Sequence, residues 1–153
     1  NSVTQVGMAK EITAKLGLNV VEATADTSAV VLQAAQSLIG RADLIYVPTD
    51  NTVVSAFSSV LKVSEENKIP IIAGEENCVA LGALATVGVN YYRLGRQTAE
   101  MALRIINGEA KPDTMPIESQ KENELVINVD AAEAMGITIP EDLMARATIV
   151  HNQ

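Results

Sequence analysis

The sequence predicts an α/β domain built on a doubly wound, mostly parallel β-sheet. Short apolar runs alternate with amphipathic helical patterns along almost the whole chain, and the connections between them are short. Such alternation is typical of parallel strands joined by right-handed helical crossovers. Of the 153 residues, 48% are hydrophobic but only 3% are aromatic, and there is no Trp. A core of small aliphatic side chains suits a parallel sheet that is covered by helices.

The chain is expected to open with a helix and a short strand. Ser2 is a good N-cap for a helix over about residues 3–16, whose apolar side chains recur at helical spacing. Gly17 would end this helix at the C′ position, where a left-handed backbone is needed. The apolar run over 18–24 then predicts a strand.

The same order of elements recurs twice in the next part of the chain. A helix begins at Asp26, Thr27 or Ser28 and ends at Gly40. Strands over 43–48 and 69–73 follow, separated by a helix over about 52–67. The repeated order predicts that these strands are parallel neighbours in one sheet.

The C-terminal half is less regular. We expect one or two helical turns over 79–84, a strand of small residues over 85–89 and a helix over about 91–107. Tyr91 and Tyr92 begin that helix, where they either pack on the protein or stack on an aromatic ligand. Later elements are a connector over 109–118, a strand over 124–129, a short helix over 131–135 and a terminal turn over 139–144.

The composition excludes several classes of function. The net charge is −8, and the eleven basic residues are dispersed among nineteen acidic ones, so the clusters that bind nucleic acid are absent. No apolar run approaches the ~20 residues that span a bilayer. Cys78 and His151 are the only residues of their types, which excludes internal disulfides and Cys/His metal sites. We therefore expect no metal and no cofactor, and a packing role for Cys78.

Three strands of the predicted sheet end in polar side chains. The clearest case is 46–54, where an apolar run stops at Pro48 and leads directly to Asp50, Asn51 and Thr52 before a helix. Similar transitions occur at 22–28 and 73–77. Because open α/β sheets hold ligands at the carboxyl ends of their strands, these residues predict a small-molecule site.

Each of these polar residues also has a simpler structural role. Asp50, Ser2, Thr27 and Ser28 are all suitable helix caps. The pair Glu75 and Glu76 could suggest acid–base catalysis, but the sequence provides no metal, histidine or phosphate loop to support it. We expect no catalytic residues, and a rim or solvated position for both glutamates.

A set of segments spread along the chain points to one family. They are Asn1-Ser2, AAQSL at 34–38, DLIYVPTDNT at 43–52, KIPI at 68–71, GALA at 82–85, GVNYYRLGRQ at 88–97, NVDAA at 128–132 and GITIP at 136–140. In these segments and their order, the chain resembles the substrate-binding proteins of bacterial ABC importers. Within that family it is similar to the group that binds tryptophan, tyrosine or phenylalanine.

The resemblance implies a type I periplasmic binding protein fold, in which two lobes close on a ligand. The chain corresponds to the second, C-terminal lobe over 1–153, without that lobe's first strand, so we expect it to be a fragment. The missing strand would lie between 18–24 and 43–48, and its absence would favour self-association. Residues of about 109–153 would include segments that pack toward the other lobe.

The resemblance also implies roles for the site residues. Asp50 would pair with the ammonium group of an amino acid, and Asn51 and Thr52 would add neutral hydrogen bonds. Asn1 and Ser2 would hold the ligand carboxylate at a helix N-terminus. Further contacts would come from Thr27, Ser28, Glu75 and Glu76.

The implied protein is not an enzyme. It would deliver its ligand to a membrane permease from the periplasm or the outer face of the membrane, in free or lipid-anchored form. Two other functions stay open at this point: the effector-binding domain of a transcription regulator with the same fold, and an α/β enzyme that uses Asp50 with Glu75 or Glu76.

Overall fold

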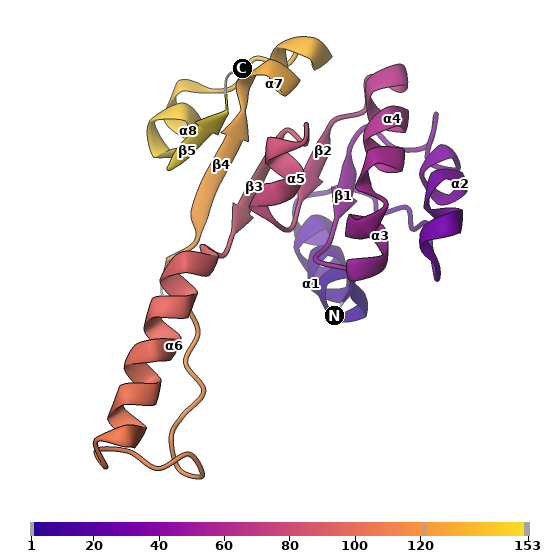
Figure 1. The fold of residues 1–153 in the computed structure, drawn as a ribbon. Helices are drawn as coiled ribbons and strands as arrows, with labels where there is room; N and C mark the ends of the chain where they lie inside the picture. Colours follow the sequence, from indigo (N-terminus) through magenta and orange to yellow (C-terminus); the bar gives the residue numbers. More distant parts are fainter. Residues whose placement is uncertain (1, 121, 152–153) are drawn as a thin grey trace.

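A five-stranded, mostly parallel sheet forms the centre of the molecule (Figure 1). The computed structural model describes residues 2–120 and 122–151. In the sheet, β1 (Ile45–Val47), β2 (Ile71–Ala73) and β3 (Ala85–Gly88) are parallel neighbours. The next strand, β4 (Glu124–Asn128), is antiparallel to β3, and β5 (Ile149–His151) is parallel to β4. The predicted α/β fold and the order of its first three paired strands are confirmed.

Most helices lie near their predicted positions. The helical turns predicted over 79–84 are instead a helix over Glu76–Ala80, and the helix predicted over 131–135 begins earlier, at Val129. The predicted helix over 52–67 is divided in two at Ala56, whose φ of −115° and ψ of 24° are not helical. The predicted helix up to Gly40 ends earlier, and residues 37–41 form turns. The helices are α1 (Ser2–Lys15), the 3-10 helix η1 (Ser28–Val30), α2 (Val31–Gln36), α3 (Asn51–Ser55), α4 (Phe57–Asn67), α5 (Glu76–Ala80), α6 (Tyr91–Ile106), α7 (Val129–Met135) and α8 (Glu141–Arg146).

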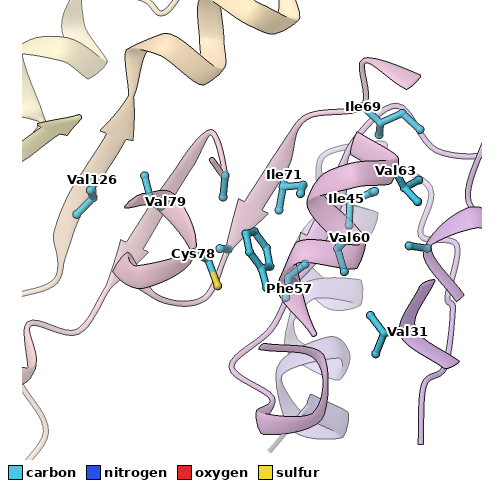
Figure 2. Packing of buried hydrophobic residues seen from close by; sticks show 14 residues of the cluster. Val31, Ile45, Phe57, Val60, Val63, Ile69, Ile71, Cys78, Val79 and Val126 are labelled. Carbon is cyan, nitrogen blue, oxygen red and sulfur yellow. The ribbon is translucent and has the colours of Figure 1, made fainter. Parts of the chain in front are cut away.

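The apolar core lies on one face of the sheet, under α2, α4 and α5 (Figure 2). Alternate residues of a strand point to opposite faces, and in β1 these are the buried pair Ile45 and Val47. Phe57 of α4 is the largest fully buried side chain of the core. Cys78 of α5 also belongs to this cluster, with its side chain close to Phe57 in Figure 2. The packing role predicted for Cys78 is confirmed.

The opposite face of the sheet is thinly covered. Tyr46 of β1 is 41% exposed and Val87 of β3 is 65% exposed. Helix α1 lies on this face, because its Gln5 is 3.4 Å from the hydroxyl of Tyr46. None of the described α1 residues is buried, although the helix carries apolar side chains such as Ile12. The sheet therefore has helices on both faces, but only one face has a packed core.

The predicted strand over 18–24 is wrong. The structure describes all of these residues and gives them no strand. Leu18, Val20 and Val21 are among the exposed apolar side chains. A strand is stabilised by ladder hydrogen bonds to a neighbour, and residues 18–24 pair with none of the five described strands. Apolar composition alone does not make a strand here.

Helix α6 projects away from the sheet, and the chain returns beside it toward β4 (Figure 1). The side chain of Gln97 donates to Glu118 over 3.2 Å, and Arg104 forms an ion pair with the same glutamate. We call residues 91–119, which comprise α6 and this returning segment, the arm. The packing expected of Tyr91 and Tyr92 is not seen within the described chain, because both side chains are exposed.

The C-terminal region contains two features that the sequence left unassigned. The terminal turn predicted over 139–144 is the short helix α8, and it leads to the additional strand β5. The antiparallel direction of β4 was not predicted either.

No helix within the described ranges 2–120 and 122–151 has both the length and the apolar character needed to cross a membrane.

We expect the chain to self-associate through the free edge of β1. Unpaired N–H and C=O groups and exposed apolar side chains, including Leu44, favour pairing with another strand. Leu44→Lys places a charge beside that edge and should shift the chain toward monomer in size-exclusion chromatography with light scattering.

The matched control is Ser58→Lys, at an exposed position of the helix α4 rather than beside a strand edge. A wild-type chain that is already monomeric at high concentration would contradict the prediction. Adding a strand that pairs with the β1 edge should also raise the thermal midpoint of unfolding. An unchanged midpoint would contradict our prediction that a further strand belongs between residues 18–24 and β1.

Candidate functional site

The carboxyl ends of β1, β2 and β3 meet at one edge of the sheet. The N–H of Gly74, just after β2, donates to the carbonyl of Val47 at the end of β1 over 2.8 Å. The hydroxyl of Thr49 donates to the carbonyl of Gly74 over 3.3 Å. A Cβ built on Gly74 would lie 2.7 Å from the Thr49 hydroxyl oxygen, so the two strand ends are in close contact. The expected convergence of polar strand ends is confirmed for β1 and β2.

Asp50 caps helix α3. Its Oδ1 accepts hydrogen bonds from the backbone N–H groups of Thr52 at 3.0 Å and of Val53 at 3.1 Å. The bond from Val53, followed by one from the side chain of Ser2, lowers the pKa of Asp50 below its ordinary value. The carboxylate is therefore ionised at neutral pH, and the structural role weighed for Asp50 is confirmed.

Helix α1 contacts this strand end through Ser2 and Gln5. Ser2 is the first described residue of α1 and hydrogen-bonds Asp50. Gln5 Oε1 accepts from the backbone N–H of Thr49 over 3.1 Å. These contacts bring the start of α1 against the carboxylate. Asn1, the other residue predicted at this helix end, lies outside the described residues.

The residues predicted around Asp50 are arranged at different depths. Asn51 is the exposed first residue of α3, and Thr52 is half-buried. Helix η1, which begins at Ser28, contacts α3 and so lies near this edge. Thr27 occupies the N-cap position of η1, but its side chain makes no capping hydrogen bond to any described residue.

Glu75 and Glu76 lie at the carboxyl end of β2. Glu75 is at the N-cap position of α5 without a side-chain capping bond among the described residues, and Glu76 is the first residue of that helix. The thiol of Cys78 approaches Glu75 Oε1 at 3.9 Å. Burial and the Glu75 carboxylate raise the pKa of Cys78 to about 11. A buried thiol with this pKa is not a nucleophile at neutral pH.

Sequence reasoning missed four residues at this edge. Gln5 and Thr49 fix the loop before Asp50, and Asn90 and Glu124 continue the polar row at the end of β3 and the start of β4. Thr49 and Asn90 could have been found, because each follows an apolar strand. Glu124 could not, because it reaches this edge only through the antiparallel direction of β4.

The described surface is open at the predicted site. A hollow of about 270 Å³ does occur, but it is lined by residues of α5 and α7, such as Ala80 and Met135. It lies toward Asn128, at the other end of β4 from Glu124, and none of the predicted site residues lines it. Among the described residues, no group of three or more His, Cys, Asp or Glu side chains could hold a metal ion.

Comparison with known proteins assigns a family to this arrangement. A family model described as ABC transporter substrate binding protein matches residues 1–151. A tyrosine-binding protein of Clostridioides difficile is 43% identical over 135 residues, which are 88% of this chain and 39% of that protein. The chain thus spans less than half the length of this relative.

Solved structures show the same fold. A structure described as an ABC domain in complex with L-Trp, from Streptococcus pneumonia, has a TM-score of 0.90 at 33% identity and covers 98% of this chain. A conserved domain protein from Vibrio cholerae has a TM-score of 0.89 at 39% identity, with the same coverage. A ligand-free, open substrate binding protein from Clostridium difficile, with adhesive properties, covers the whole chain with a TM-score of 0.77 at 42% identity. This chain covers 50%, 50% and 51% of the three, respectively.

Gly74→Ala should disturb the predicted site. The added Cβ would lie 2.8 Å from the backbone nitrogen of Thr49, which cannot move without shifting the Asp50 loop. Overpacking of this kind costs about 1–3 kcal/mol in the free energy of unfolding, to be measured by urea titration. In the control, Gly95→Ala, the Cβ meets nothing within 4 Å and should stabilise α6 by about 0.5–1 kcal/mol. Equal effects of the two changes would contradict the close contact.

The thiol of Cys78 should label slowly in the native protein. With a pKa of about 11, almost all of the thiol is protonated at mildly alkaline pH, and the core also covers the sulfur. A maleimide or disulfide reagent should therefore react at the rate of local opening, and quickly once denaturant is added. Fast stoichiometric labelling of folded protein would contradict this assignment.

Proposed function

The chain belongs to the ABC transporter substrate-binding protein family, and from this premise we propose that it forms one lobe of a receptor for an amino acid with an aromatic side chain. The protein binds this ligand outside the cytoplasmic membrane and delivers it unchanged to a membrane permease. Support for the ligand class comes from two relatives, one described as tyrosine-binding and one as a complex with L-Trp.

The observation that carries the proposal is the contact between Asp50 and the start of α1. Asp50 is an ionised carboxylate, and the first turn of α1 contains no acidic residue, so its free N–H groups favour an anion. Ser2 connects the two groups. An α-amino acid carries an ammonium and a carboxylate on one carbon. A carboxylate beside a helix N-terminus matches that charge pair.

Capping does not use the whole acceptor capacity of Asp50. Both backbone bonds reach Oδ1, whereas an ionised carboxylate has about four acceptor positions over its two oxygens. An ammonium group can therefore bind while α3 stays capped. Asn51, Thr52, Thr27 and Ser28 would add neutral polar contacts around it, and Glu75 and Glu76 would form the rim toward β2.

The other half of the protein is needed to close the site. The chain spans 50% of the structure described as an L-Trp complex, and the predicted residues lie on an open edge of the sheet. We infer that a second lobe covers this edge, and that it also covers the exposed apolar side chains of α6. Ligand binding between two lobes requires no chemistry on the ligand.

Asp50→Asn in the full-length gene product should weaken binding of the amino acid. Asn is itself a good N-cap, so α3 stays capped and only the charge is removed. Loss of a charge-assisted hydrogen bond costs about 1.5–3 kcal/mol, which is roughly a tenfold to hundredfold rise in Kd by isothermal titration.

The matched control is Asp113→Asn, an exposed carboxylate in the returning segment of the arm. A panel of tyrosine, tryptophan, phenylalanine, leucine and glutamate tests the ligand class in the same experiment. If the Asp50→Asn protein binds the amino acid with wild-type affinity, Asp50 only caps α3 and does not bind the ligand. Recovery of a chemically altered amino acid would overturn the receptor function.

A further inference from the structure

The chain passes twice through one joint at the base of the arm. It leaves the sheet from β3 through Asn90 into α6, and Glu122 and Asn123 of the returning chain lead into β4 (Figure 1). The two passages lie side by side, because Gly88 at the end of β3 pairs with Glu124 at the start of β4. Any change in the direction of the arm must therefore occur at this joint.

Three polar side chains connect the two passages. Asn90 caps α6 by accepting from the N–H of Arg93 over 2.9 Å, and its amide donates to Glu124 Oε2 over 2.7 Å. Arg93 lies 3.4 Å from Glu124 Oε1. Both oxygens of Glu124 are thus engaged, one by each residue of the outgoing passage.

Glu124 is unusual for its position. Its side chain is only 7% exposed, whereas Glu122, which also pairs with Arg93 at 3.8 Å, is 83% exposed. A carboxylate with this little contact with water is stable only while it is hydrogen-bonded or paired. We therefore expect Glu124 to keep its hydrogen bond to Asn90 and its ion pair with Arg93 as long as the joint keeps this geometry.

Apolar packing does not fix the arm in the described chain. None of the described residues of α6 is buried. The exposed side of the helix carries apolar or small residues at helical spacing, which are Tyr92, Gly95, Ala99, Leu103 and Ile106. On its other side, Gln97 and Arg104 bind Glu118 of the returning segment, so the two parts of the arm are connected to each other. The orientation of the arm therefore depends on the polar contacts of Glu124 with Asn90 and Arg93 at the joint.

We propose that Asn90, Arg93 and Glu124 form a lock that fixes the direction of the arm relative to the sheet. The lock has a functional consequence that rests on the proposed two-lobed receptor: with the exposed side of α6 against the second lobe, the lock sets how far the two lobes stand apart. The chain superposes less closely on the ligand-free, open relative than on the relative with bound L-Trp, although it is more similar in sequence to the former.

The lock is tested on this chain without any ligand, so its failure is separate from failure of the proposed function. Spin labels are attached at Ile106→Cys, near the end of α6, and Ser58→Cys, on exposed α4. Native Cys78 needs no replacement because it is buried. The labelled chain is diluted into an excess of unlabelled chain, so that self-association adds no distances between labels on different chains. Electron–electron double resonance should then give one narrow distance distribution. Glu124→Gln keeps the shape and the contact with Asn90 but removes the charge that Arg93 needs, so it should broaden and shift this distribution.

Glu122→Gln is the matched control, because it removes the exposed and weaker partner of the same arginine. It should leave the distribution narrow. Arg93→Gln, at a half-exposed side chain, should broaden the distribution as Glu124→Gln does, and it decides the question if circular dichroism shows that Glu124→Gln unfolds the sheet. Distributions of folded Glu124→Gln and Arg93→Gln that coincide with the unsubstituted labelled chain would overturn the lock.

Discussion

The parallel pairing of β1, β2 and β3 is the constraint on which the candidate site depends. The pairing holds because the apolar layer of α4 and α5, with Phe57 and Cys78 at its centre, covers one face of these short strands. Parallel strands end at the same edge, so Asp50 and Glu75 are brought to one side of the molecule. At this edge, Gly74 allows the backbone of Thr49 to approach within contact distance. A core on one face thus positions a polar row that it does not touch.

The parts of the fold that could be predicted are those whose sequence pattern lies within one short segment of the chain. Residues 43–48 and 69–73 could be predicted as strands because their apolar runs are bounded by turn residues. In the structure, these two strands pair with each other. Residues 18–24 carry the same kind of run but do not form a strand, because strand formation also depends on a neighbour that the described chain does not provide. The direction of β4 depends on the projecting arm, which contains no local signal for an antiparallel return.

The site shows the same division. Asp50 could be predicted from sequence because its role as a cap depends on Thr52 and Val53, which lie two and three residues further along the chain. Only the resemblance to a family implied that Ser2 lies at the same site, and its hydrogen bond to Asp50 was not predicted, since nothing between α1 and β1 indicates that they meet. Gln5 was missed because its amide lies in the first turn of an exposed helix and acquires a role only when Thr49 lies opposite. A residue whose contacts lie within one helical turn could be predicted from the sequence. A residue whose contacts lie in another helix or strand could not.

The incompletely buried surfaces of the chain share one physical explanation. Helix α1, the free edge of β1 and the outer side of α6 each expose apolar groups that a folded protein normally covers. Two of these surfaces, α1 and the edge of β1, adjoin the candidate site through Gln5 and Thr49. The third belongs to an arm whose base is held by Glu124 at the same edge of the sheet. A second lobe that covers the polar edge would therefore be connected to the first through the arm, so that closing over a ligand and reorienting the arm become one movement.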